Sequence, residues 1–589
     1  MSLLDPDQVV VGHRWRRYAA VAGVVVVLWL LTVGVLLMRA KSDATSGLAS
    51  ISAAQRLTGP SDLVAGTALR PLGDAHRSFA SAHHRFASLL VAPLRLTPVL
   101  GRQLRSATAL AAAAEQVSAT GVDLVKQARS ALQEPHKTGP ERVLATRRIA
   151  DVAAGAERRL DRVSLGPSRA LIGPLARKRR DLVSKLAKVR RSLHDGAVVG
   201  HSLASLLDGP HNYLLLAANN AEMRSGSGMF LSVGQATFAH GDLAMGEFRP
   251  SGLIGIDAPR TAPTITDRDL ADRWGWLNPN REWRNLGASP RFEPNASLAA
   301  AMWARVPDGH PVDGVIALDP VALAAILRAT GPVQSEGRQV TADNVIGLLL
   351  HDQYTGIQNL DLAAQTGRRE QLGAIAKTTL AAFQTGGFDM AKLASGLADA
   401  ARGRHLLVWA SDPTQQEAWA TIGVDGRMGG SQMMVSVLNR GGNKLDQFLQ
   451  VDAALEIGRS SAGSDCTLRI TLHNTAPSGE SIYIQGPYPG SGLGAGDYGG
   501  ILSVDLPGQA GQLSSDGGAL VADGADGAER VVALPVRIPR GASQTFTIKF
   551  SLPNGHGRLV VTPSARVPGE RWSAPGGSWT DSLPRTVLW

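Results

Sequence analysis

The stretch VDGVIALDPVALAAILRATGPV, residues 312–333, indicates how the middle of this 589-residue chain folds. Val315 to Leu318 form a short, continuous apolar run, which is typical of a strand buried on both faces. Asp319 follows at a position where its carboxylate can cap a helix, and Pro320 suits the first helical turn. Gly331 comes where such a helix would end. The stretch therefore predicts a strand followed directly by a helix.

The surrounding segments repeat this alternation between strands and helices. Apolar runs predict strands at 213–218, 229–239, 243–248 and 405–409. Further helices are predicted from Thr341 or Asp343 to Tyr354 and over 368–384. Strands that alternate with helices favour an αβα sandwich with a mixed sheet, so we assign residues 211–430 to a central α/β domain.

Near the amino end, residues 18–38 (YAAVAGVVVVLWLLTVGVLLM) form an uncharged apolar run. About 20 apolar residues span the hydrocarbon core of a bilayer as a helix. Arginines at 14, 16 and 17 precede the run, which favours a cytoplasmic tail at 1–17 and an extracytoplasmic remainder. We therefore expect a single-pass protein of the cell membrane. The alternative is a cleaved signal peptide, whose apolar region is usually shorter, at about 7–15 residues.

Residues 42–208 predict a helical stalk or bundle, because they are rich in Ala, Leu and Arg. Prolines divide the stretch into several helices, the clearest at 100–133, 140–164 and 175–207. From residue 39 to 208 there are 27 Lys and Arg against 13 Asp and Glu, although the whole chain has a net charge of +10. This basic excess favours anionic lipid headgroups or an anionic wall polymer as partners, or it is an ordinary solvated helix surface.

From about residue 431 onward, short alternating strands separated by Gly, Pro, Asn and Asp predict an all-β sandwich over 431–589. The chain has a single cysteine, Cys466, which rules out an intrachain disulfide and argues against a cysteine-based metal site. We predict that Cys466 is a core thiol. Three tryptophans in the tail either stack on sugar rings or pack into the domain: Trp572, Trp579 and Trp589.

Several segments together resemble the membrane-anchored bacterial family known as domain of unknown function 4012. They include NYLLLAANNAEMRSGSGMFLSVGQATF (212–238), the opening stretch at 312–333, and VLNRGGNKLD (437–446), and the resemblance covers about 211–480. The apolar run and the basic stalk also fit this family. The resemblance implies no established activity.

The order of elements is also similar to that of the LytR–CpsA–Psr phosphotransferases, which attach glycopolymers from a polyprenyl-linked donor to the cell wall. Arginine motifs of that family are matched by residues 224–225 and 249–250, and its Arg-x-x-Gln helix start by residues 368–371. Arginines that converge on one cleft can grip a pyrophosphate, and glycines allow its close approach to the backbone. The resemblance implies catalytic roles for Arg224, Arg249, Arg368 and Gln371, and binding roles for Ser225, Gly226, Gly228 and Arg369.

The chain lacks the aspartates that follow both arginine motifs in that family. Gly226 follows Arg224-Ser225, and Pro250 follows Arg249. Magnesium prefers carboxylate oxygens, so metal-assisted transfer requires substitutes elsewhere in the chain. The candidate magnesium ligands are Asp319, which also suits a helix cap, and Asp352.

Two classes of function remain open. One is an envelope phosphotransferase or binder that acts on a phosphate-linked glycopolymer, which requires the arginines to converge in one pocket. The other is a non-catalytic envelope scaffold, or a glycan- or protein-binding module, that uses the stalk and the β-sandwich. The expected partners are the membrane and a polyprenyl-phosphate-linked glycan or anionic wall polymer, and nucleic acid is not expected outside the cell.

Overall fold

The computed structural model describes residues 11–57, 62, 65–133, 138–255, 262–335, 337–355, 373–382, 388–488 and 490–589. The chain divides into two compact units. The first unit contains residues 1–134 and 147–198, and the second contains residues 135–146 and 199–589.

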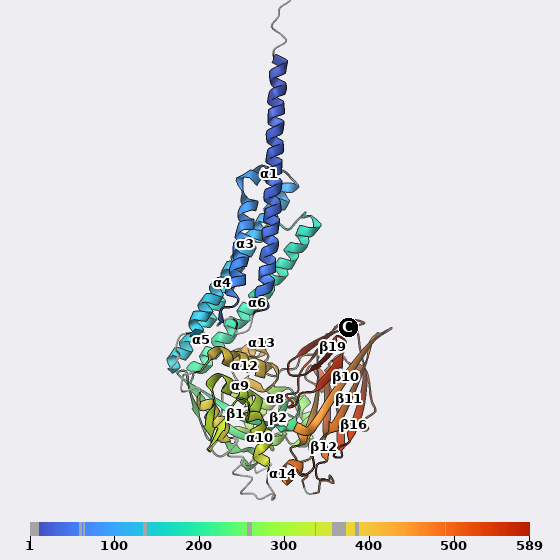
Figure 1. Ribbon diagram of the computed structural model, residues 1–589. Coiled ribbons are helices and arrows are strands. Elements are labelled where there is room, and N and C mark those ends of the chain that lie inside the picture. Colours follow the sequence, from blue (N-terminus) through green and yellow to red (C-terminus); the bar gives the residue numbers. More distant parts are fainter. Residues whose placement is uncertain are drawn as a thin grey trace, which may run out of the picture. The chain divides into compact units, whose positions relative to one another are not determined.

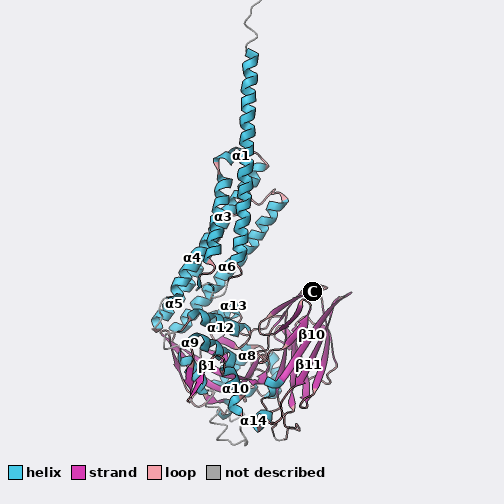
Figure 2. Ribbon diagram, in the orientation of Figure 1, coloured by secondary structure: helices cyan, strands magenta, loops and turns pink. Residues whose placement is uncertain are grey.

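The first unit is built from helices (Figure 1, Figure 2). They are α1 (Val11–Ala54), α3 (Leu69–Ala87), the 3-10 helix η1 (Leu89–Leu96), α4 (Leu100–Gln133), and the larger parts of α5 (Gly139–Asp161) and α6 (Gly173–Asp208). Residues 139–146 of α5 and 199–208 of α6 belong to the second unit. α1 packs against α3, and α3 packs against α4. The predicted helices at 100–133, 140–164 and 175–207 correspond to α4, α5 and α6, which confirms the helical nature of the basic stalk.

α1 contains the apolar run at residues 18–38. Among the described residues it is the one helix that is long and apolar enough to cross a membrane. Most of its apolar side chains between Val24 and Met38 are exposed, as expected of a surface that contacts lipid. The helix continues without interruption to Ala54, so the apolar run and the first stalk helix form one element.

A mixed sheet forms the centre of the second unit, with the strand order β3-β2-β1-β5-β8 and β4 paired to β2. β1 runs antiparallel to β2 and parallel to β5, and β5 runs antiparallel to β8. The strands are β1 (His211–Arg224), β2 (Ser227–Ala239), β3 (Asp242–Met245), β4 (Arg249–Pro250), β5 (Gly314–Leu318) and β8 (Leu406–Ala410). The predicted mixed sheet is therefore present.

The helices around this sheet are α7 (Arg268–Trp274), α8 (Phe292–Trp303), α9 (Pro320–Thr330), α10 (Val345–Leu350), α12 (Met390–Arg402) and α13 (Pro413–Ile422). Shorter elements are η2 (Ser251–Leu253), η3 (Gly275–Leu277), η4 (Trp283–Asn285), β6 (Val333–Ser335), β7 (Arg338–Val340) and η5 (Asp352–Tyr354). Asp319 caps α9 as predicted, because its side chain accepts hydrogen bonds from the first backbone N–H groups of the helix.

The two faces of β1 belong to different hydrophobic cores. Leu215 and Ala217 pack with residues of α9, α10 and α12. Leu214 and Leu216 pack on the other face with residues of α7 and α8, and Leu438 and Ile501 from the C-terminal strands join the same core. Helices therefore lie on both faces of the sheet, and C-terminal strands share one face with them.

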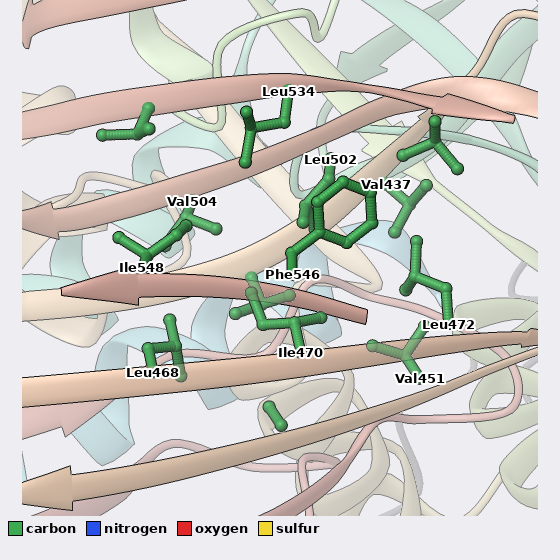
Figure 3. Packing of buried hydrophobic residues seen from close by; sticks show 14 of the residues in the cluster. Val437, Val451, Leu468, Ile470, Leu472, Leu502, Val504, Leu534, Phe546 and Ile548 are labelled. Carbon is green, nitrogen blue, oxygen red and sulfur yellow. The ribbon is translucent and has the colours of Figure 1, made fainter. Parts of the chain in front are cut away.

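The C-terminal region forms two sheets, each of six strands within the described part of the chain. The first has the order β13 (Gly511–Ser515), β16 (Ser543–Leu552), β11 (Gly463–Asn474), β10 (Leu449–Ser460), β18 (Arg571–Ala574), β19 (Gly577–Thr580). The second has the order β14 (Ala522–Asp526), β15 (Glu529–Ile538), β12 (Tyr498–Pro507), β9 (Gln432–Asn439), β17 (Arg558–Val561), β20 (Arg585–Leu588). Figure 3 shows side chains of both sheets, such as Ile470 and Leu502, in one shared core.

The side chains of this region follow the predicted alternation. Cys466, Leu468 and Ile470 are buried on one face of β11, and burial raises the pKa of the Cys466 thiol to about 12. Trp572 is buried and stacks on Trp579, with 6.0 Å between ring centroids. The tail tryptophans Trp572 and Trp579 therefore pack into the region, and Trp589 is partly buried and donates a hydrogen bond to Ser464 Oγ.

Candidate functional site

The carboxyl ends of β1 and β5 lie at one edge of the central sheet, because the two strands are parallel. At this edge the register between β1 and β2 shifts between Asn219 and Met223. The extra residues of this bulge include Asn220 and Glu222, whose side chains leave the regular ladder. Ligands of open α/β sheets bind at this edge, so we take the bulge and its neighbours as the candidate functional site.

Asp319, which follows β5, connects the bulge to β8. Its Oδ1 accepts hydrogen bonds from the N–H groups of Val321 (2.9 Å) and Ala322 (3.2 Å). Its Oδ2 accepts one from Asn220 Nδ2 (2.7 Å) and lies 2.6 Å from His405 Nδ1. Burial opposes the protonated form of His405, but the Asp319 carboxylate outweighs burial and raises the pKa of His405. A histidine oriented by a carboxylate can hold and transfer a proton.

Glu222 forms a buried ion pair with Lys444, which precedes the 3-10 helix η7 (Leu445–Phe448). The Lys444 ammonium also lies over the rings of Tyr354 (4.4 Å to the centroid) and Tyr483 (5.2 Å). Burial opposes the ammonium charge, but the Glu222 carboxylate outweighs it and raises the pKa of Lys444. Lys444 is therefore a charged, enclosed side chain at neutral pH.

Asp446 is fully buried where the end of β1 meets the C-terminal strands, and we call this region, with Glu222, Lys444 and Asp446, the junction. Its carboxylate accepts hydrogen bonds from Met223 N (2.9 Å), Asn439 Nδ2 (2.8 Å), Tyr498 Oη (2.8 Å) and Arg566 Nη1 (3.0 Å). These donors come from β1, β9, β12 and the segment after β17. One carboxylate therefore joins the end of the central sheet to the C-terminal sheets.

Arg224, the last residue of β1, is also buried in this junction, at 4% exposure. Its guanidinium donates to the carbonyl oxygens of Arg284 (2.7 Å), Met223 (3.0 Å) and Asn439 (2.8 Å). Burial lowers the pKa of Arg224 to about 10. The guanidinium of Arg224 is therefore bonded to backbone carbonyls. The predicted pyrophosphate role requires a guanidinium that faces a cleft.

The predicted binding residues after Arg224 contact the protein itself. Ser225 Oγ lies 2.8 Å from Ser436 Oγ, with both groups buried. Gly226 has a φ of 71°, and its carbonyl accepts a hydrogen bond from Arg404 Nε (3.2 Å). A Cβ on Gly228 would lie 2.5 Å from the backbone of Asn219. These glycines permit close packing between protein segments.

Arg249 lies away from Arg224 along the same hairpin. It pairs with Val233 of β2, whereas Arg224 pairs with Ser227, and six residues of strand extend over roughly 20 Å. The structure does not bring these two arginines together. The other predicted residues of this set lie outside the described residues: Arg368, Arg369 and Gln371.

The guanidinium of Arg249 lies over the ring of Trp303, 4.9 Å from its centroid. Its Nη1 is 3.8 Å from Asp308 Oδ2, and its side chain is 33% exposed. Arg249 is therefore a partly exposed cation on an aromatic surface, which leaves part of it accessible to an anionic ligand.

The candidate magnesium ligands do not form a metal site. Both oxygens of Asp319 are occupied by hydrogen bonds, and Asp352 is 62% exposed on η5, where it pairs with His351. No group of three or more His, Cys, Asp or Glu side chains suited to a metal occurs among the described residues. These residues do not fit magnesium, so we derive no metal-dependent step.

Sequence reasoning missed the central charged residues of the junction. Lys444 and Asp446 lie within VLNRGGNKLD, residues 437–446. Charged residues so close to an apolar strand could have indicated a buried ion pair. Arg566 had no such signal, because it is 120 positions from Asp446 in the chain. Only the tertiary fold brings these residues together.

Comparison with protein families gives one match. Residues 208–354 match the family described as a protein of unknown function, DUF4012. No curated protein and no solved structure matches the chain. The matched range contains β1, β2, β5 and α9, including the bulge with Glu222 and the helix cap Asp319. The resemblance to this family is therefore confirmed over residues 208–354, which is part of the range at 211–480 for which it was expected.

Proposed function

We propose that this chain is a membrane-anchored, extracytoplasmic envelope protein that acts as a non-catalytic scaffold. The observation that supports it best is the buried network at the end of β1, with the ion pairs Glu222–Lys444 and Asp446–Arg566. Buried charges that are paired and hydrogen-bonded favour one arrangement of the parts they join. A scaffold needs such a fixed arrangement of its DUF4012 domain and its C-terminal sheets.

The proposed scaffold presents a C-terminal β-sandwich as its binding module. Two sheets around one core support the sandwich arrangement. The basic stalk is the part of the chain whose charge fits an anionic wall polymer, since it carries a large excess of Lys and Arg. We therefore assign that partner to the stalk, and a glycan or protein partner to the sandwich.

Cell topology tests the location. The arginines before the apolar run favour a cytoplasmic amino end and an extracytoplasmic bulk. A phosphatase that is active only outside the membrane, fused after Trp589, should be active, and a green fluorescent protein fused there should stay dark in a cell that exports it unfolded. Fluorescence without phosphatase activity would refute the proposed orientation.

Complementation of a deletion strain tests the scaffold role. Arg249→Gln and Arg368→Gln remove two of the arginines to which the phosphotransferase resemblance gives a catalytic role, and the scaffold predicts normal complementation by the double variant. Glu222→Gln, which breaks the buried junction, should complement poorly. Loss of complementation by a double variant that folds normally would count against a scaffold.

A second candidate is a LytR–CpsA–Psr-like phosphotransferase or binder of a polyprenyl-phosphate-linked glycopolymer. The partly exposed guanidinium of Arg249 over Trp303 supports it, since this cation can still pair with a phosphate. The test compares the affinity of wild type and Arg249→Ala for a polyprenyl pyrophosphate. Equal affinity would remove this candidate, and weaker binding by the variant would favour it.

A further inference from the structure

An apolar loop packs against the anchor helix in the first unit. Val33 of α1 is buried together with Val91 of η1 and Leu104 of α4, and Trp29 packs onto this cluster. Trp29 Nε1 also donates a hydrogen bond to the carbonyl oxygen of Leu90 (3.0 Å). Residues 89–100, which we call the tip, therefore lie beside the apolar part of α1.

The tip exposes large apolar side chains rather than burying them. Leu89 is 89% exposed, Leu96 is 87% exposed and Val99 is 69% exposed. Leu90 and Leu100 are also exposed. Several large, exposed apolar side chains in one short segment indicate a site of contact with a protein or a membrane. Because this segment packs against the apolar run of α1, lipid is the occupant that fits.

Several polar backbone groups of the tip have hydrogen-bond partners within the protein, which a segment in lipid requires. Ser88 Oγ accepts from Leu90 N, and Thr97 Oγ1 donates to the carbonyl of Leu94 (2.7 Å). The carbonyl of Arg95 accepts from Arg105 Nη1 (2.8 Å). These bonds lower the cost of placing an irregular turn in a medium without water.

The position of Trp29 sets the depth of the tip. From Trp29 to Met38, where the apolar run ends, α1 rises by about 14 Å at about 1.5 Å per residue. One leaflet contributes about 15 Å to the hydrocarbon core. If residues 18–38 span the core, a loop bonded to Trp29 must enter the leaflet.

A basic cavity of about 380 Å³ lies next to the tip. Its lining includes Arg95 from the tip, Arg105 from α4 and Arg162 from the loop after α5. His83 also lines it and is paired with Glu115 (2.7 Å). Arg95 and Arg105 each also donate one hydrogen bond to a backbone carbonyl. Three arginines that line a cavity beside an exposed apolar segment suit the phosphate of a lipid headgroup.

We propose that the tip inserts into the leaflet on the side of the folded units, and that the basic cavity behind it holds the phosphate of an anionic lipid. This inference rests on the membrane anchoring in the proposed function. It gives the first unit a second membrane contact besides the span itself, which would restrain the tilt of the stalk.

Depth-dependent quenching tests the insertion. The full chain carrying Leu96→Cys is labelled with an environment-sensitive dye and reconstituted into phosphatidylcholine vesicles whose acyl chains carry a spin label. Gln133→Cys is the control, because it is exposed at the far end of α4, about 50 Å away along the helix. Buried Cys466 should take up little dye.

We expect loss of fluorescence at position 96 and none at position 133. Equal behaviour of the two labels would overturn the insertion. Vesicle flotation after an alkaline wash distinguishes membrane anchoring from insertion of the tip. If the wild-type protein leaves the vesicles, membrane anchoring itself is refuted. If the protein is retained but the label at position 96 is not quenched, only the insertion of the tip is refuted.

Native mass spectrometry of the full chain, released from nanodiscs that contain phosphatidylglycerol, tests the cavity. Wild type should retain a phosphatidylglycerol molecule that the double variant Arg105→Gln, Arg162→Gln loses. The control variant Lys188→Gln, Arg191→Gln removes the same charge from exposed positions on α6 and should retain the lipid. Retention by the cavity variant, or release of the lipid by inorganic phosphate alone, would overturn the lipid site.

Discussion

Replacing Glu222 with Gln removes the carboxylate that faces the Lys444 ammonium inside the second unit. The Lys444 side chain is 2% exposed and the Glu222 side chain 10%, so water cannot replace the lost partner. Removing one member of a buried ion pair costs about 3–5 kcal/mol. At about 1.4 kcal/mol per tenfold change, the unfolding equilibrium constant should rise by roughly two to three and a half powers of ten.

The double variant Glu222→Gln, Lys444→Met should recover most of this loss. Methionine is unbranched like lysine and one atom shorter, and its thioether should make favourable contacts with the rings of Tyr354 and Tyr483. Replacing both charges of a buried pair by neutral groups of similar volume is often neutral or stabilising. If Lys444→Met raises the stability of the Glu222→Gln variant, the loss came from the unpaired ammonium group. If it lowers the stability further, the loss came from a packing defect.

Urea unfolding of the full chain in detergent, followed by tryptophan fluorescence, measures both effects. All tryptophans except Trp15 and Trp29 belong to the second unit, so the signal reports on that unit. Asp452→Asn, in an exposed pair with Arg571, is the control and should leave the midpoint unchanged. The reasoning fails if Glu222→Gln behaves like this control, or if Lys444→Met does not rescue it.

Three further predictions concern other buried groups. Arg224→Gln should destabilise the second unit by about 1–3 kcal/mol, because it leaves buried carbonyls unpaired, whereas Arg249→Gln should not; equal midpoints in urea would contradict this. Burial and the charge of Asp526 raise the pKa of Glu529 from 4.5 to about 7, so the folded state holds its proton more tightly. The stability that Glu529 contributes is complete below pH 4.5 and is lost as pH rises to 7. The Glu529→Gln variant should therefore show a flatter dependence of the urea midpoint on pH in this range. Cys466, with a pKa of about 12, should react with iodoacetamide at pH 8 only after unfolding, and rapid labelling of the native protein would refute its burial.

Local pattern was sufficient for several elements of the fold, but the helices α7, α8, α12 and α13 were not predicted. The strand at Val315 to Leu318, the cap at Asp319 and the helix that follows are all present, because each depends on neighbours in the chain. The stalk helices and the alternation along β11 follow from the same short-range rules.

The site was much less predictable. The arginine motifs specified Arg224 and Arg249 as partners, yet the two lie apart, and Arg224 bonds to carbonyls of segments about 60 and 215 positions away. A motif records residue types and spacing but not which long-range segment fills the space around them. The predicted domains at 211–430 and 431–589 likewise share a core, since Leu438 and Ile501 pack with the central sheet.

The amino-acid sequence alone was enough to identify the apolar run, the basic helical stalk and the strand–helix order, because these depend on periodicity and composition over short distances. The DUF4012 segment was identified in a different way, by its resemblance to a known family. Tertiary structure alone decided that Glu222, Lys444, Asp446 and Arg566 form one buried network, and that the tip lies against α1. Both features join residues that are far apart in the chain. Their stability comes from burial and charge pairing, which exist only once the chain has folded.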